Sequence, residues 1–236
     1  MLGIASVLVS FQAGTTPTER DPNRPVSVFV IDMAQNDLQL TKPADGVRFD
    51  IDGSGSPIQV AWTQAKSDDA FLFLDTNANG KVDSGRELIG SGWRKIDGSR
   101  VTGGDEALMV IQGLLWGLPL GPVAPENEQY VWVDENDDAF HTLRLWNDDN
   151  HNGQSEPSEL RTLQQANVFK IFTGFSLNKR RMHDTGNAFL FEGHLYLKPG
   201  GPGERGFDGK VPPEGRYARR MVAVEFARRV LLTSDF

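Results

Sequence analysis

Two stretches of the chain combine acidic, amide and glycine residues at a spacing that suits a hard metal ion. The first reads Asp75-Thr-Asn-Ala-Asn-Gly-Lys-Val-Asp, and the second reads Asp148-Asp-Asn-His-Asn-Gly-Gln-Ser-Glu. In each, positions 1, 3 and 5 carry side-chain oxygens, and a glycine at position 6 permits a sharp turn. Calcium takes roughly six to eight oxygen ligands, so a loop that turns several oxygens inward meets its needs.

Both stretches also contain later carboxylates that could close the ligand shell. The EF-hand pattern places a glutamate at position 12, which Glu159 occupies in the second stretch. In the first stretch Glu87 stands at position 13, because Gly85 adds one residue. The alternative is a solvated Asn-Gly turn, which needs no distal acid. We predict two calcium loops whose ligands are Asp75, Asn77, Asn79, Lys81 (by its backbone carbonyl), Asp83 and Glu87, and Asp148, Asn150, Asn152, Gln154, Glu156 and Glu159.

Two fainter half-sites precede these loops along the chain. One alternates Asp50, Asp52 and Ser54, with Asp68 and Asp69 as the nearest acids beyond it. The other alternates Asp134, Asn136 and Asp138 but lacks the glycine. Because EF-hands usually work in pairs, the sequence suggests that each strong loop shares a site with its half-site neighbour. The alternative for both is a solvated turn.

Composition excludes several kinds of site. The 236 residues carry a formal net charge of −8, which disfavours a general nucleic-acid binder. With no cysteine, the chain has no thiolate zinc site, disulfide or cysteine nucleophile. The four histidines are dispersed, and neither a Gly-x-Ser-x-Gly elbow nor a phosphate-binding loop is present.

The elements that must position the loops predict an α+β fold, dominated by β-strands, with EF-hand-like calcium loops at strand ends and one or two short helices. Apolar periodicity favours one helix over 106–116, and a second short helix is expected over 159–167. We expect one compact domain made of residues 26–120 and 121–236. Strands are expected within 26–40, over 47–52, 58–63, 71–74, 130–133 and 140–146, and over 169–177, 188–197 and 219–232.

The first 25 residues begin with a short apolar run followed by a polar, loop-like stretch. This pattern is typical of the end of a signal peptide, and the alternative is an N-terminal strand. No later apolar run reaches the length of a membrane span. We therefore expect an extracellular or cell-surface protein.

Several stretches of the chain resemble a known family. The stretches Val47-Arg-Phe-Asp-Ile-Asp-Gly, Leu74-Asp-Thr-Asn-Ala-Asn-Gly and Leu143-Arg-Leu-Trp are similar to the calcium-binding module of large bacterial exported proteins. Those include haemolysin-type and iron-regulated RTX proteins. The resemblance covers roughly 45–197 and implies calcium binding and export, with no settled catalytic activity. The glycine-rich nonapeptide array of RTX proteins is absent.

Together these features predict a secreted structural or interaction domain stabilised by calcium, with another surface protein or a glycan as a possible class of partner. The alternative is a secreted hydrolase with structural calcium sites. Asp97 and Glu128 are candidate catalytic acids for that alternative, and the sequence favours neither over the other. A third hypothesis is a basic face over 179–181 and 216–229 for an anionic glycan or nucleic acid; a strand with one solvated face explains it more simply.

Overall fold

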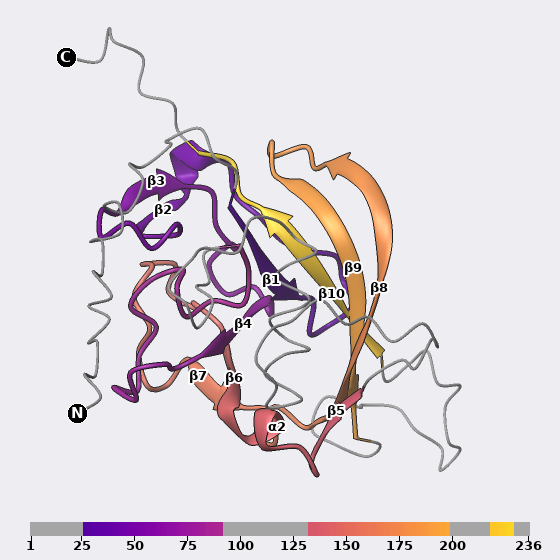
Figure 1. The fold of residues 1–236 in the computed structure, drawn as a ribbon. Coiled ribbons are helices and arrows are strands. Elements are labelled where there is room, and N and C mark those ends of the chain that lie inside the picture. The colour runs from indigo at the N-terminus through magenta and orange to yellow at the C-terminus, as the bar shows by residue number, and fades with distance from the viewer. Residues whose placement is uncertain (1–25, 92–131, 199–217, 229–236) are drawn as a thin grey trace, which may run out of the picture.

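A computed structural model of the chain describes residues 26–91, 132–198 and 218–228. These residues form mainly β-strands joined by long polar loops (Figure 1). The elements are β1 (Ser27–Ile31), η1 (Pro43–Asp45), β2 (Val47–Phe49), β3 (Ile58–Val60), β4 (Ala70–Leu74), β5 (Trp132–Asp134), α2 (Asp138–Thr142), β6 (Leu143–Trp146), β7 (Leu160–Thr162), β8 (Val168–Met182), β9 (Ala188–Leu197) and β10 (Ala218–Glu225).

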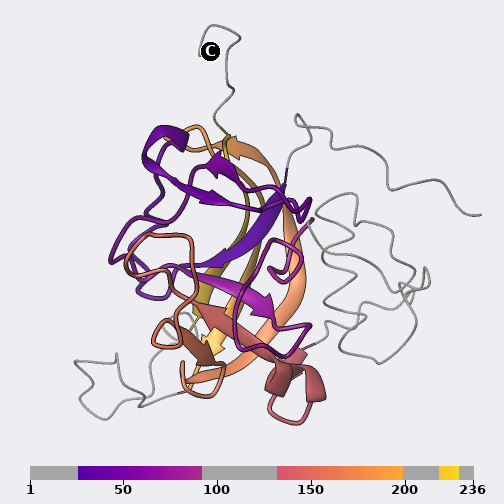
Figure 2. The same cartoon turned by 90° about the vertical axis from the view of Figure 1, so that its left-hand side faces the viewer.

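Eight strands form one curled antiparallel sheet, in the order β5-β8-β9-β10-β1-β4-β6-β7. The long β8 and β9 bend along one side of the molecule, and β2 and β3 form a separate hairpin (Figures 1 and 2). In the centre of the sheet, β1 and β4 from the first part of the chain lie between β10 and β6 from its second part. The expected halves 26–120 and 121–236 therefore pair within a single sheet.

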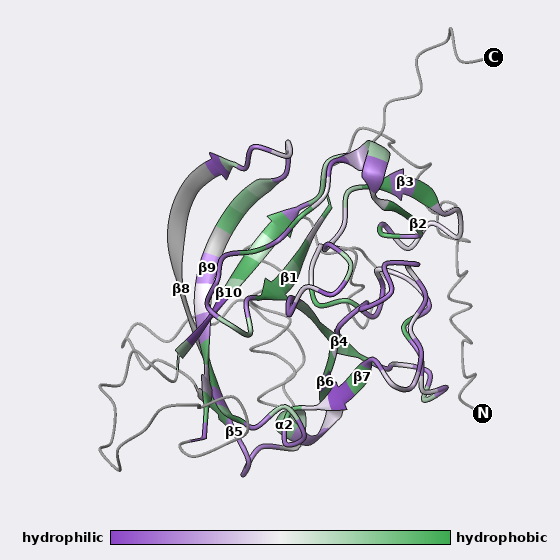
Figure 3. Ribbon diagram, turned by 180° about the vertical axis from the view of Figure 1, so that it is seen from behind, coloured by the Kyte–Doolittle hydropathy of each residue, from purple (hydrophilic) through white to green (hydrophobic). Residues whose placement is uncertain are grey.

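Successive side chains of the central strands point to opposite faces of the sheet, and apolar side chains are buried on both faces. In β1 every residue is buried: Phe29 and Ile31 face one cluster, while Val28 and Val30 face another. Figure 3 shows this hydrophobic centre surrounded by hydrophilic loops. Burial on both faces explains why β1 reads as a continuous apolar run rather than as an alternating one.

The second cluster holds a group of aromatic rings beneath the polar loops. The ring centroid of Trp62 lies 4.5 Å from that of Phe71 and 5.6 Å from that of Trp146. Phe49 and Phe226 complete the group, with centroids 5.0 and 5.6 Å from that of Trp62. The loops that follow β2, β4 and β6 therefore rest on one aromatic layer.

The expectation of an α+β fold with EF-hand-like loops is wrong. Within the described ranges the only α-helix is the five-residue α2, and it flanks neither strong loop. The loop after β4 returns to pair Leu88 with Phe73, and the loop after β6 returns as β7. Backbone groups at the loop ends are thus satisfied by the sheet instead of by flanking helices. The molecule is β-dominated.

Several predicted elements can be checked against this structure. The short helix expected over 159–167 is wrong, because residues 160–162 pair with β6 as β7. The strand expected over 140–146 is shortened, since α2 takes its first residues. The predicted signal-like segment, the helix over 106–116, Asp97 and Glu128 all lie outside the described residues. Among the residues described, no helix is long and apolar enough to cross a bilayer.

Candidate metal centres

The loop of residues 75–87, called here the Asp75 loop, follows β4 directly. Asp75 accepts hydrogen bonds from the backbone N–H groups of Asn79 (3.1 Å) and Gly80 (2.8 Å). The side-chain amides of Asn77 and Asn79 both donate to Oδ2 of Asp83, at 2.8 and 2.6 Å. The side chains at positions 1, 3, 5 and 9 are therefore held within one loop.

The loop of residues 148–159, the Asp148 loop, repeats this arrangement after β6. Asp148 accepts from the N–H groups of Asn152 (3.1 Å) and Gly153 (2.9 Å). The amides of Asn150 and Asn152 donate to Glu156 at 3.3 and 2.8 Å. Two loops from different parts of the chain thus adopt the same internal hydrogen bonding.

The distal glutamates occupy equivalent places despite their different spacing. Glu87 accepts from the N–H groups at positions 2 and 9 of its loop, Thr76 (3.1 Å) and Asp83 (2.9 Å). Glu159 accepts from the residues at the same positions, Asp149 and Glu156, at 3.1 and 3.2 Å. The additional residue before Glu87 therefore does not remove its carboxylate from the loop.

Backbone geometry agrees with the hydrogen bonding. Positions 4 and 6 of both loops adopt a positive φ: Ala78 (57°) and Gly80 (76°) in one, His151 (58°) and Gly153 (70°) in the other. Glycine adopts this region without steric cost, whereas alanine and histidine do not. Both loops therefore hold a residue with a Cβ in the left-handed region at position 4.

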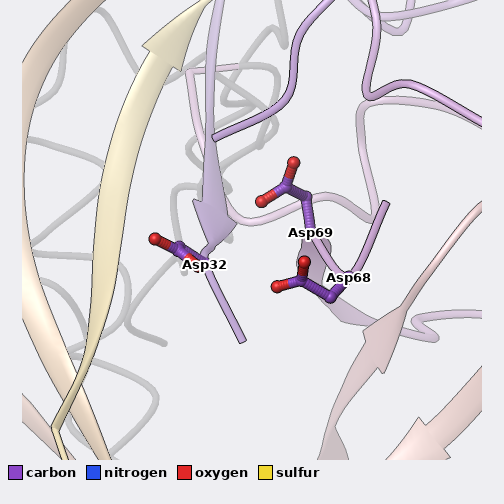
Figure 4. A group of neighbouring side chains, drawn as sticks. All are labelled: Asp32, Asp68 and Asp69. Atoms are coloured by element: carbon purple, nitrogen blue, oxygen red, sulfur yellow. The ribbon is translucent and has the colours of Figure 1, made fainter. Parts of the chain in front are cut away.

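The half-site at residues 50–55, the Asp50 loop, has the same turn but lacks a late acid of its own. The N–H of Ser54 donates to Asp50 (2.8 Å) and to Asp52 (3.1 Å), and Gly55 N–H donates to Asp50 (2.8 Å). Asp68 and Asp69, the acids expected to complete it, instead lie beside Asp32 (Figure 4). This loop therefore has two carboxylates and a hydroxyl.

The half-site that begins at Asp134 has a different geometry. Its carboxylate accepts from the backbone and side-chain amides of Asn136, at 2.9 and 2.8 Å. The chain then passes through Asp137 directly into α2, which begins at Asp138. No residue of this half-site repeats the position 5 and position 6 bonds of the loops above.

The two strong loops touch each other at equivalent residues. Val82, at position 8 of the Asp75 loop, donates its N–H to Oγ of Ser155, at position 8 of the Asp148 loop (2.7 Å). The Asp50 loop packs against the returning arm of the Asp75 loop, where Gly85 N–H donates to the Asp50 carbonyl (2.8 Å). The sequence suggested that the Asp75 loop pairs with the Asp50 half-site and the Asp148 loop with the Asp134 half-site, and it gave no contact between the two strong loops. The structure brings the Asp75 loop into contact with both of the others.

Two core tryptophans anchor the Asp148 loop to the aromatic layer. The indole N–H of Trp62 donates to Oδ2 of Asp148 at 2.8 Å, and that of Trp146 donates to Oε2 of Glu159 at 3.3 Å. All four residues are buried. The ring nitrogens of His151 lie against the carbonyl oxygens of Thr63 and Asp45, at 2.6 and 2.8 Å. The Asp148 loop is therefore held more firmly than the largely exposed Asp75 loop.

Burial and mutual hydrogen bonds shift the pKa values of several loop carboxyl groups. Desolvation, together with the neighbouring Glu156 side chain, raises the pKa of Glu159. Hydrogen bonds from the Asn152 side chain, and with Glu159, lower the pKa of Glu156. Burial alone would raise the pKa of Asp52, but hydrogen bonds from Ser54 bring it below its ordinary value. The Glu156–Glu159 pair thus favours one protonated and one ionised carboxyl as the pH falls.

The donor set of both strong loops fits a hard divalent cation. Each holds three carboxylates, those of Asp75, Asp83 and Glu87 or of Asp148, Glu156 and Glu159. The remaining side-chain donors are amide oxygens of asparagine, and oxygen ligands of this kind are those that calcium takes. Thiolate and imidazole ligands, which would favour zinc or copper, do not contribute. Lys81 and Gln154, expected to ligate through backbone carbonyls, stand at the same position of their respective loops.

A fourth turn of this kind follows β1 and was missed by sequence analysis. In residues 32–37, the Asp32 turn, Asp32 accepts from the N–H groups of Asn36 (3.1 Å) and Asp37 (3.0 Å). Gln35 and Asp37, at positions 4 and 6, have φ values of 59° and 68°. Asp37 stands where the other turns have glycine, so the glycine pattern did not reveal it. The sequence did contain a signal: an aspartate, Asp32, directly follows a strand-like run, and Asn36 and Asp37 come four and five residues later.

The fold and these turns define a class of protein: an antiparallel β protein whose strands end in acidic, oxygen-rich loops. A model of the SPM domain matches residues 29–112 and 124–204, which is more than half of the chain. The chain therefore belongs to the SPM domain family. Both strong loops lie inside the matched segments.

A curated relative agrees with the predicted resemblance at a coarse level. The iron-regulated protein FrpA of Neisseria meningitidis serogroup C is 32% identical over 155 residues. The match covers 63% of this chain and 12% of FrpA, so the chain spans only a small part of that protein's length. This match confirms the predicted similarity to an iron-regulated protein over part of the chain.

Proposed function

We propose that the chain binds calcium at the Asp75 loop and the Asp148 loop, and that the bound ions stabilise the fold of an exported bacterial domain. The observation that carries this proposal is the repetition of one hydrogen-bond pattern, with side-chain oxygens at positions 1, 3, 5 and 9 and a distal glutamate, in both loops. Chance acidic turns have no reason to share the distal glutamate as well.

The charge of each loop sets the expected affinity. Three carboxylates and two amides form a modest ligand set, and the Asp75 loop is largely exposed. Extracellular calcium modules bind in the range of roughly 10⁻⁴–10⁻³ M, which suits calcium outside the cell. The Asp148 loop should bind more tightly than the Asp75 loop, because Trp62 and Trp146 already hold two of its carboxylates in place. The resemblance of residues 45–197 to the module of large bacterial exported proteins supports export of this domain, and the match to the iron-regulated protein FrpA agrees with that resemblance.

Calorimetric titration of the chelator-stripped chain tests the proposal. Calcium should release or absorb heat at two or more sites, and Asp75→Ala and Asp148→Ala should each remove one of them. Asp45→Ala is the matched control, because the side chain of Asp45 is exposed outside every loop and the substitution keeps the backbone carbonyl that meets His151. Magnesium at equal concentration should replace calcium poorly, since it demands a tight octahedral shell. Equal heats for the wild type and the double variant would refute the proposal.

A further inference from the structure

Each strong loop contains an asparagine followed by a glycine, and these are the two Asn-Gly pairs of the chain: Asn79-Gly80 and Asn152-Gly153. Such a pair has an intrinsic reaction, because the peptide nitrogen that follows an asparagine can attack the amide carbon of the asparagine side chain. A glycine leaves this nitrogen unhindered, since it has no Cβ. The surroundings of the two pairs therefore decide which of them reacts.

The hydrogen bonds around Asn79 engage the groups that this reaction uses. The side-chain Oδ1 of Asn79 accepts the N–H of Lys81 at 2.9 Å, which folds the side chain over the Gly80 peptide and polarises the amide carbonyl. The N–H of Gly80, whose nitrogen must attack, donates to Oδ2 of Asp75 at 2.8 Å. Asp75 is therefore placed to accept the proton that this nitrogen loses. The Asp75 loop thus holds an electrophile, a nucleophile and a base next to one another.

The Asn152-Gly153 pair is packed against the rest of the molecule. Gly153 is buried, and a Cβ at this position would lie 3.0 Å from Cγ2 of Val47. A Cβ on the exposed Gly80 would meet nothing within 4 Å. The acceptor of the Gly153 N–H, Asp148, is itself buried and also binds a tryptophan indole N–H. Because ring closure requires the peptide plane to turn, the exposed Asn79-Gly80 pair is the one with room to react.

We propose that Asn79 is a site of spontaneous deamidation. The nitrogen of Gly80 forms a bond to the amide carbon of Asn79 and gives its proton to Asp75, from which the proton returns to solvent. The side-chain nitrogen of Asn79 takes up a proton from water and leaves as ammonia. Water then opens the resulting cyclic succinimide at either of its carbonyl carbons, which yields aspartate or isoaspartate at residue 79. No oxidant, reductant or cofactor takes part.

Both products alter the Asp75 loop. Aspartate adds a carboxylate to those of Asp75, Asp83 and Glu87. Isoaspartate in addition lengthens the main chain by a methylene group and shortens the side chain, so it displaces the oxygen at position 5 of the loop. The deamidation site does not depend on the proposed function. A calcium ion bound at this loop would hold Oδ1 of Asn79 and the carboxylate of Asp75, so it should slow the reaction.

Peptide mapping by mass spectrometry of the full, chelator-stripped chain, kept in mildly alkaline buffer, tests the site. The peptide that contains Asn79 should first lose ammonia, then show the mass of an NH₂-to-OH exchange and separate into aspartate and isoaspartate forms. In the native chain Asn79 should react roughly tenfold faster than Asn152, because the exposed loop opens more readily. This difference should vanish in guanidinium chloride. Equal native rates at the two pairs, or an Asn79 that stays intact while the unfolded chain is converted, would overturn the proposal.

Asn79→Gln and Asn152→Gln form a matched pair of variants. Glutamine keeps the amide but places its carbon one bond further from the following peptide nitrogen. Asn79→Gln should abolish the change in mass at its own peptide, and Asn152→Gln should leave the reaction of Asn79 unaffected. A change that persists at that peptide in Asn79→Gln would assign the reaction to another residue and overturn the site.

Adding calcium separates the failure of this site from the failure of the proposed function. Saturating calcium should slow the reaction of Asn79 in the wild-type chain. If calcium leaves the rate unchanged, the deamidation site stands and calcium binding at the Asp75 loop fails. If the chain takes up calcium but Asn79 stays intact in the chelated form, the deamidation site fails instead.

Discussion

Single residues in this protein serve the core and the loops at once. Trp62 packs among aromatic rings, yet its indole N–H is directed to Asp148, 86 positions along the chain. The sequence identified Asp148 as a ligand from local spacing. It could not identify Trp62 as the partner of Asp148, because such contacts depend on how the sheet folds. The same limit hid the cluster of Asp32, Asp68 and Asp69.

Asp69 should make the metal-free protein less stable as the pH rises. Burial, first, and the nearby Asp68 and Asp32 carboxylates raise its pKa from 3.8 to about 7. The native state then holds a proton that the unfolded chain releases near pH 4. This contribution to stability is complete below pH 4 and is lost as the pH rises through 7.

Urea unfolding in the presence of a chelator, at pH 5 and pH 7.5, checks this prediction. Between these two values the wild type should lose roughly 2–3 kcal/mol that Asp69→Asn retains. Asp45→Asn, which alters an exposed carboxyl, should follow the wild type. If Asp69→Asn and the wild type change in parallel, Asp69 is ionised in the native state throughout this range.

At the scale of elements, the sequence predicted where the loops lie but not what flanks them. Asp75 and Asp32 follow β4 and β1 directly, as strand-then-acid patterns indicated for Asp75. The helices implied by the EF-hand pattern do not form around the loops. The strand β6 offers backbone groups to residues 160–162, and this sheet pairing outweighs the helical tendency of that segment.

Gly85 shows how tightly the elements constrain the Asp75 loop. A Cβ at this position would lie 1.8 Å from the carbonyl oxygen of Ile51, so the backbone would have to move. Gly85→Ala should lower the free energy of unfolding by about 1–3 kcal/mol. It should also weaken calcium binding at this loop, because Glu87 follows two residues later. The measurement is urea unfolding together with calorimetric titration.

Ser84→Ala is the matched control for this substitution. Ser84 is the adjacent residue, and its Oγ accepts only a 3.3 Å hydrogen bond from the Arg86 N–H. Its replacement should cost less than about 1 kcal/mol and leave the calcium titration unchanged. If Gly85→Ala behaves like Ser84→Ala, the backbone at Ile51 moves aside at little cost in stability, and the contact between the Asp50 and Asp75 loops does not position Glu87.

For the molecule as a whole, the interleaved strand order links both loops to one unfolding event. The Asp75 loop follows β4 and the Asp148 loop follows β6, and these two strands are paired. An ion bound at either loop should therefore stabilise the entire sheet. At calcium one hundred times its Kd, a site contributes about 2.7 kcal/mol, or roughly 5–10 °C in Tm for a domain of this size.

Scanning calorimetry with and without calcium tests this coupling. The wild type should show one transition that calcium moves to higher temperature, and Asp75→Ala or Asp148→Ala should each retain part of the shift. The larger loss is expected for Asp148→Ala, because its carboxylate also accepts the Trp62 indole N–H beneath the loop. Two separate transitions, only one of which responds to calcium, would show that the loops stabilise independent parts of the chain despite the pairing of β4 with β6.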